Sequence, residues 1–132
     1  MTKLQAQYKD LHKAFGRLKE AVALPADVTI NQDATIQRFE FTFEIAWKLM
    51  KTIIELEGLN VASPRSAIRQ AATVGLIDNP SVWLEFLENR NLTVHTYKEE
   101  VARKVYQSAK DFIPYVEELS IKIKDYLDKF TY

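Results

Sequence analysis

Few helix-breaking residues interrupt this chain. It has only three Gly and four Pro in 132 residues, so long helices are favoured over strands and hairpins. Apolar residues recur every three or four positions, which is the period of a helix with one buried face. The sequence contains no alternating strand pattern, hairpin signal, internal repeat or low-complexity segment. We therefore predict an all-α fold.

Two long helices are predicted in the first half of the chain. The first ends before Pro25, residues 24–31 form a connection, and the second runs from about Gln32 to Leu56, where Gly58 stops it. The apolar stripe of the first comprises Leu4, Tyr8, Leu11, Phe15, Leu18 and Val22. The stripe of the second comprises Ile36, Phe39, Phe43, Ala46, Met50 and Ile53.

Further apolar residues of the second helix lie off its main stripe, namely Phe41, Ile45, Trp47 and Ile54. A helix that is apolar around so much of its circumference is buried on more than one side. It is therefore either central in a bundle or part of a dimer interface. We expect a homodimer in which Phe41, Ile45 and Trp47 contribute to the contact, because exposed together they would form an apolar patch.

Two short helices are predicted next, each with Pro at its first position. Ser63 is the N-cap of the first, which stops at Gly75. Asn79 precedes the second, which ends near Arg90 and whose Trp83 we expect in the core or an interface.

One long helix completes the chain. Thr96 and Glu99 have the spacing of a capping box, which predicts Thr96 as N-cap and Tyr97 as the first helical residue. The apolar period continues across Pro114 to about Phe130, so we expect one kinked helix there. The chain is thus predicted to be a single domain, residues 1–132, folded as an antiparallel up-and-down bundle of about five helices.

Charge and cysteine content exclude several classes of function. Eighteen basic residues balance eighteen acidic ones, which argues against bulk electrostatic capture of nucleic acid but leaves room for a local phosphate site. The absence of Cys removes disulfides, thiolate metal sites and a Cys nucleophile. With only two His and no paired carboxylate spacing, we expect no metal site and no cofactor. No signal-peptide core or membrane span is apparent, so the expected location is the cytoplasm.

Residues 90–97, Arg-Asn-Leu-Thr-Val-His-Thr-Tyr, carry the densest chemistry. Arg90 can hold a phosphate, His95 can move a proton near neutral pH, and Tyr97 offers a phenol for nucleophilic attack or modification. If residues 91–95 form a turn, Arg90, His95 and the start of the last helix can converge on one phosphate. The alternative is structural, because Arg is also favoured in a last helical turn by the helix dipole.

Other candidate residues have simpler explanations. His12 lies on the polar side of the first helix and is expected to be solvated. Glu44 and Lys48 have the spacing of a helix-surface ion pair. Arg65 and Arg69 share a helix face, where they are solvated or make a second phosphate contact. The sequence contains neither a Gly-rich phosphate loop nor a Gly-x-Ser-x-Gly nucleophile turn.

Four segments together resemble a known family. They are FEFTFEIAWKLMK (39–51), SPRSAIRQAATVGLI (63–77), the Trp83 helix and ENRNLTVHTYKEE (88–100). In this order they are similar to the nucleotidyltransferase substrate-binding proteins, a branch of the HEPN superfamily, over about residues 5–130. The resemblance implies a HEPN-like four-helix bundle that pairs as a homodimer and is encoded beside a small, separate nucleotidyltransferase. It also implies a likeness to the helical C-terminal domain of kanamycin nucleotidyltransferase.

The resemblance implies two roles. In one, the chain is a substrate-binding or partner subunit of the minimal nucleotidyltransferase, in a module of toxin–antitoxin type. In the other, it is a metal-independent ribonuclease toxin that uses Arg90 and His95, silenced when the transferase adenylylates Tyr97. By position, Asn91 is the polar residue after the Arg, and Arg90, Asn91 and Thr96 are the expected phosphate or nucleotide contacts. We favour the non-catalytic partner subunit and keep the RNA endonuclease as the alternative.

Overall fold

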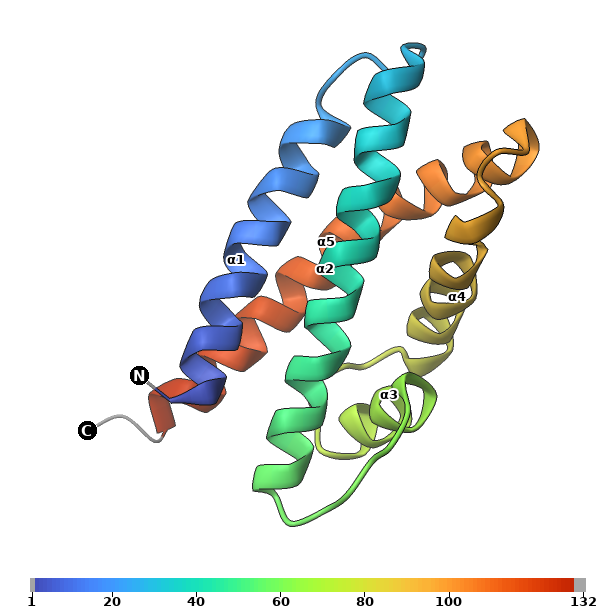
Figure 1. The fold of residues 1–132 in the computed structure, drawn as a ribbon. Helices are drawn as coiled ribbons and strands as arrows, with labels where there is room; N and C mark the ends of the chain where they lie inside the picture. The colour runs from blue at the N-terminus through green and yellow to red at the C-terminus, as the bar shows by residue number, and fades with distance from the viewer. Residues whose placement is uncertain (1, 130–132) are drawn as a thin grey trace.

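The computed structural model describes residues 2–129, which form five α-helices, one 3₁₀ turn and no strand. The elements are α1 (Lys3–Val22), α2 (Thr29–Leu56), α3 (Pro64–Thr73), α4 (Pro80–Asn91), η1 (Leu92–His95) and α5 (Glu99–Lys129). Helices α1 and α2 run antiparallel, α5 crosses behind them, and α3 and α4 lie beside α2 (Figure 1). The predicted all-α bundle is confirmed.

Glycines end two of the helices as predicted. Gly58 and Gly75 have φ angles of 89° and 84°, in the left-handed region that only Gly enters without strain. After α2, the Leu59 amide donates to the Ile54 carbonyl at 3.1 Å and the Gly58 amide to the Glu55 carbonyl at 3.0 Å. This pair of bonds is a Schellman motif, which satisfies carbonyls that the helix leaves open.

Aromatic rings from three helices form the centre of the core. Phe112 of α5 lies between Phe39 and Phe43 of α2 and Trp83 and Phe86 of α4, with ring centroids 4.9–5.9 Å away. Phe39, Phe43 and Phe112 are fully buried and Trp83 is 2% exposed. The contacts of Phe112 with Phe39, Trp83 and Phe86 are edge to face, a geometry that stabilises beyond the area it buries. The cluster fixes α4, and with it Arg90, against α2 and α5.

Helix α2 differs from prediction at its start and on one face. It begins at Thr29 rather than Gln32, after Val28, which makes no side-chain cap bond. Of the three residues expected on an exposed apolar face, only Phe41 is exposed, at 51%. Ile45 and Trp47 are half-buried against the core, so the expected patch is smaller than predicted.

Helix α5 is continuous through Pro114, as the apolar period predicted. Its buried side includes Val105, Phe112, Val116, Leu119 and Ile123. The predicted last residue, Phe130, lies outside the described residues. Within residues 2–129 no helix has both the length and the apolar character needed to span a membrane.

Candidate functional site

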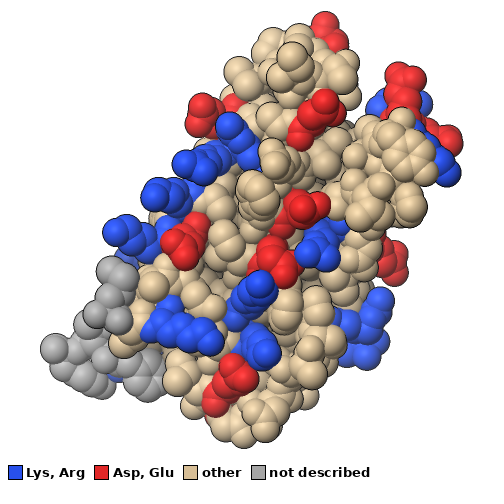
Figure 2. All heavy atoms as spheres, in the orientation of Figure 1, with Lys and Arg blue, Asp and Glu red and all other residues tan. Residues whose placement is uncertain are grey.

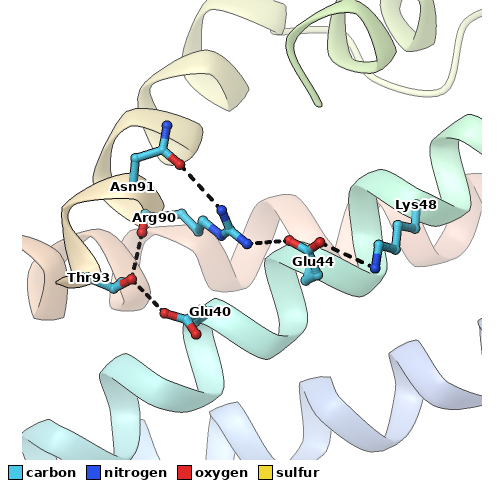
Figure 3. Close-up of polar contacts among 6 residues, drawn as sticks. All are labelled: Glu40, Glu44, Lys48, Arg90, Asn91 and Thr93. Atoms are coloured by element: carbon cyan, nitrogen blue, oxygen red, sulfur yellow. Dashed lines mark hydrogen bonds and ion pairs between the residues drawn. The ribbon is translucent and has the colours of Figure 1, made fainter. Parts of the chain in front are cut away.

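Arg90 lies in the last turn of α4 and reaches across to α2. Its Nη2 is 2.6 Å from Glu44 Oε2, and both side chains are 31% exposed (Figure 3). Its Nη1 also donates to Asn91 Oδ1 over a longer 3.4 Å, whereas its Nε is buried and has no hydrogen-bond partner in the described structure. The Glu44 carboxylate therefore occupies one edge of the Arg90 guanidinium. A phosphate oxygen that bound this edge would have to displace the carboxylate.

A second contact joins α2 to the turn that follows α4. Thr93, in the middle of η1, donates its hydroxyl to Glu40 Oε2 at 2.5 Å, and the same hydroxyl oxygen lies 2.8 Å from the Arg90 carbonyl oxygen (Figure 3). Glu40 and Glu44 are one helical turn apart on the same side of α2. Glu44 thus binds Arg90 at the end of α4, and Glu40 binds Thr93 in the turn that follows.

The predicted N-cap of the last helix is wrong. Thr96 has a helical backbone, with φ −73° and ψ −2°, and its hydroxyl donates back to the Thr93 carbonyl at 3.0 Å. Helix α5 begins three residues later, at Glu99, so Tyr97 precedes the helix instead of opening it. A 3₁₀ turn at residues 92–95 displaced the cap, because Thr96 closes that turn instead.

The start of α5 is also less suited to a phosphate than predicted. Its first turn contains Glu99 and Glu100, whose charges already complement the helix dipole. Glu99 also pairs with Arg103, at 3.1 Å. Among the described residues no hydrogen bond joins Arg90 to His95, but two groups that both donate to a phosphate need none between them. Convergence of Arg90, His95 and this helix end on one phosphate therefore stays a prediction.

His95 and Tyr97 lie together on the exterior. Both are exposed, Tyr97 to 77%, and their rings meet edge to face with centroids 6.1 Å apart. The Lys98 ammonium is 5.9 Å from the Tyr97 ring centroid. These residues form the corner between η1 and α5, at the end of α5 remote from the start of α1 (Figure 1).

An open cleft of about 650 Å³ separates the first half of α2 from this corner. It is lined by Thr29, Asp33, Ile36, Gln37, Glu40, Thr93, Thr96 and Tyr97. The charged residues of this lining, Asp33 and Glu40, are both acidic. A free anion is therefore disfavoured in the cleft, whereas the Tyr97 ring forms part of its wall and can be approached from it.

The other candidate residues have the simpler roles. His12 is exposed and pairs with the Tyr8 hydroxyl at 3.0 Å. Glu44 and Lys48 form the predicted ion pair, at 3.4 Å. Arg65 and Arg69 are both exposed, as expected for solvated side chains. No group of three or more His, Cys, Asp or Glu side chains within residues 2–129 is arranged to hold a metal ion.

Sequence reasoning missed the contribution of α2 to the site. The spacing of Glu44 and Lys48 predicted their ion pair. It did not predict the contact of Glu44 with Arg90 or that of Glu40 with Thr93. A different signal was present, because Glu40 and Glu44 are the two carboxylates in the largely apolar run FEFTFEIAW (39–47). Half-buried carboxylates on such a helix usually need a partner.

Comparisons with known proteins give the family. The family described as nucleotidyltransferase substrate binding protein like matches residues 6–125. The chain belongs to this family. It is 29% identical over 119 residues to the probable ribonuclease HepT of Haemophilus influenzae, covering 83% of this chain and 82% of that protein.

Two solved structures share the fold. A protein from Thermus thermophilus superposes with a TM-score of 0.80 and 38% identity, covering 86% of this chain and 98% of its own. A Haemophilus influenzae protein, described as having the fold of a substrate binding domain of a nucleotidyltransferase, superposes with a TM-score of 0.70 and 27% identity, covering 92% and 96%. The likeness thus spans nearly the whole bundle.

Proposed function

We propose that this chain is the helical partner subunit of a separate minimal nucleotidyltransferase, and that Tyr97 is the residue on which that transferase acts. The carrying observation is the 77% exposure of Tyr97 at an outer corner of the bundle. A side chain that enters another enzyme's active site has to project from its own fold. Family membership supports the same kind of partner.

The chemistry of this modification is a nucleotidyl transfer. The Tyr97 hydroxyl oxygen attacks the α-phosphorus of ATP, the bond from that phosphorus to the bridging oxygen breaks, and pyrophosphate leaves. The phenolic proton passes to a base of the transferase. The product carries one AMP on Tyr97, and this bulky anion would lie beside His95.

Intact mass measurement tests this proposal directly. Wild-type protein, incubated with a minimal nucleotidyltransferase from the same genome and ATP, should gain the mass of one AMP group and co-elute with the transferase on gel filtration. Tyr97→Phe should gain none. Tyr106→Phe, which removes a half-buried hydroxyl on α5, should behave as wild type. The proposal fails if wild type neither co-elutes nor gains mass.

Metal-independent RNA cleavage is the second candidate function. The specific observation is the presence of Arg90 and His95 on adjoining elements, together with a relative named as a probable ribonuclease. His95 would take the proton of a ribose 2′-hydroxyl, whose oxygen attacks the phosphorus while the 5′-oxygen leaves. Arg90 would stabilise the charge on the pentacoordinate phosphate.

One His does not readily serve as both base and acid, so we further propose a homodimer that brings two motifs together. A groove of about 310 Å³ between α1 and α2 supports this pairing. Phe41, Ile45 and Ala14 supply apolar lining, and charges of both signs lie around them. Such a surface can match a second copy of itself across a two-fold axis. Glu44 also lines the groove, so a second copy there would lie close to Arg90.

Cleavage of RNA in EDTA tests the second candidate. His95→Ala should abolish it, and His12→Ala, at the only other His, should leave it unchanged. Cleavage that persists in His95→Ala would remove that residue from the mechanism. The neutral overall charge predicts weak RNA capture. On the face drawn in Figure 2, basic side chains follow the α1 edge, and others lie among acidic ones elsewhere on that face.

A further inference from the structure

The segment between α4 and α5 is attached to α2 at two points. Arg90 is bound to Glu44 and Thr93 to Glu40, over sequence separations of 46 and 53 residues. Thr96 extends the second attachment, since its hydroxyl donates to the Thr93 carbonyl. The chain of contacts therefore runs from α2 through Thr93 to the residue before Tyr97.

A four-residue 3₁₀ turn does not hold its shape well unaided. Its hydrogen bonds are poorer than those of an α-helix, and none of the residues of η1 is buried. Of its two apolar residues, Leu92 packs half-buried against the core, whereas Val94 is 72% exposed. The charge-assisted bond from Thr93 to Glu40 on the long helix α2 restrains the rest of the turn.

We infer that Glu40 and Glu44 are positioning residues for residues 90–97, the segment that carries Arg90, His95 and Tyr97. This inference rests on the function proposed above. Glu40 anchors η1 through Thr93 and so sets where His95 and Tyr97 project. Glu44 orients the guanidinium of Arg90 toward α2. Neither carboxylate is required to touch the reacting atoms, and each acts through the residue that it holds.

Lys48 provides the matched control for Glu44. It pairs with the same carboxylate, at 3.4 Å, but its side chain is 56% exposed, and among the residues drawn in Figure 3 its contact is with Glu44 rather than with Arg90 or Thr93. A purely electrostatic role for this cluster would make Lys48 as important as Glu44. If Glu44 acts by positioning Arg90, Lys48→Ala should leave the hydrogen exchange of Arg90 as it is in wild type.

Hydrogen exchange on the unmodified protein tests the inference without requiring any activity. Glu40→Ala should lower amide protection at residues 93–97 about tenfold, the effect of losing a hydrogen bond to a charged group. Glu40→Gln, whose amide oxygen still accepts the Thr93 hydroxyl, should restore most of it. Equal protection in wild type and Glu40→Ala would overturn the role of Glu40.

The Nε–H resonance of Arg90 gives the corresponding signature for Glu44. In wild type this group is buried, so it should exchange slowly with water. Glu44→Ala should release the side chain and speed that exchange about tenfold, whereas Glu44→Gln and Lys48→Ala should preserve slow exchange. An unchanged signal in Glu44→Ala would overturn the role of Glu44.

Kinetics then connect positioning to function. For Tyr97 modification by the transferase, Glu40→Ala should lower kcat/KM about tenfold at unchanged folded fraction, and Glu40→Gln should recover it. If wild type is never modified, the proposed function fails while the exchange measurements still decide the positioning. If wild type is modified and Glu40→Ala is modified equally fast, the positioning inference fails and the proposed function stands.

Discussion

Ser63 shows how a single side chain sets the start of an element. Its hydroxyl oxygen accepts the Ser66 amide at 3.1 Å, and the Ser66 hydroxyl oxygen accepts the Ser63 amide at 3.2 Å, which completes a reciprocal capping box. Asn79 stands in the equivalent place before α4 and makes no side-chain cap bond. The two helix starts, which look alike in sequence, are therefore held differently.

This contrast makes a prediction. Ser63→Ala should reduce the free energy of unfolding by about 1 kcal/mol, because an amide loses its acceptor at the start of α3. Asn79→Ala should change it by only a few tenths of a kcal/mol. Urea denaturation of both variants measures the difference, and equal losses would contradict the role given to the Ser63 hydroxyl.

Tyr126 predicts a pH dependence at the other end of the molecule. Burial, and then the charge and hydrogen bond of Glu57, raise the pKa of its phenol above the usual value of 10.0. Above pH 10 the unfolded chain releases this proton first, so the folded state binds more protons and loses stability as pH rises. Stability attributable to Tyr126 is thus full below pH 10. Tyr126→Phe should show a shallower decline of the free energy of unfolding above about pH 10, and parallel curves would argue against the raised pKa.

At the scale of elements, helix lengths follow from where the chain can leave a helix. Gly58 and Gly75 end α2 and α3 by entering the left-handed region, whereas Gly16 lies inside α1 with a helical backbone. The same residue type therefore has opposite effects at these sites. In the first two it permits a turn, and in the third it only weakens a helix.

A pair of alanine substitutions tests this difference. Gly58→Ala should destabilise by about 1–2 kcal/mol, because a Cβ is strained at φ 89°. Gly16→Ala should stabilise by about 0.5–1 kcal/mol, since an added Cβ there meets nothing within 4 Å. Thermal melts of the two variants should shift in opposite directions. A shift in the same direction would contradict the conformational explanation.

For the whole molecule, the question is which face receives a second copy. Phe41 is 51% exposed in the α1–α2 groove, where Arg38 donates to the Arg17 carbonyl at 2.8 Å and ties the two helices together. Acidic and basic side chains mix over α2 on this face (Figure 2). An apolar centre with a charged surround is typical of an interface.

Sedimentation equilibrium tests the proposed dimer. At tens of micromolar, wild type should be dimeric and Phe41→Glu monomeric, because the variant places a charge in the apolar centre of the contact. Ile121→Glu, at a similarly exposed apolar residue on α5 (59%), should remain dimeric. A monomeric wild type would overturn the dimer, and with it the two-motif arrangement for RNA cleavage.

The sequence by itself determined the elements of this fold, because its signals are local. The apolar period identified the long helices, Gly58 and Gly75 marked ends, and the pattern across Pro114 indicated one helix. Arg90, His95 and Tyr97 were also found as a segment, since their spacing is visible along the chain. The wrong prediction of Thr96 as N-cap also has a local cause. The Thr96 hydroxyl could cap the last helix or bond back to the preceding turn, and in the structure it donates to the Thr93 carbonyl.

Only the tertiary structure decided what that segment touches. Glu40 and Glu44 meet residues about fifty positions away, and this pairing depends on how the aromatic cluster around Phe112 packs α4 against α2. The packing of the helices also decided that Trp47 is half-buried against the core whereas Phe41 is 51% exposed. Periodicity specifies which face of a helix is apolar, but the partner of each face depends on how the helices pack in three dimensions.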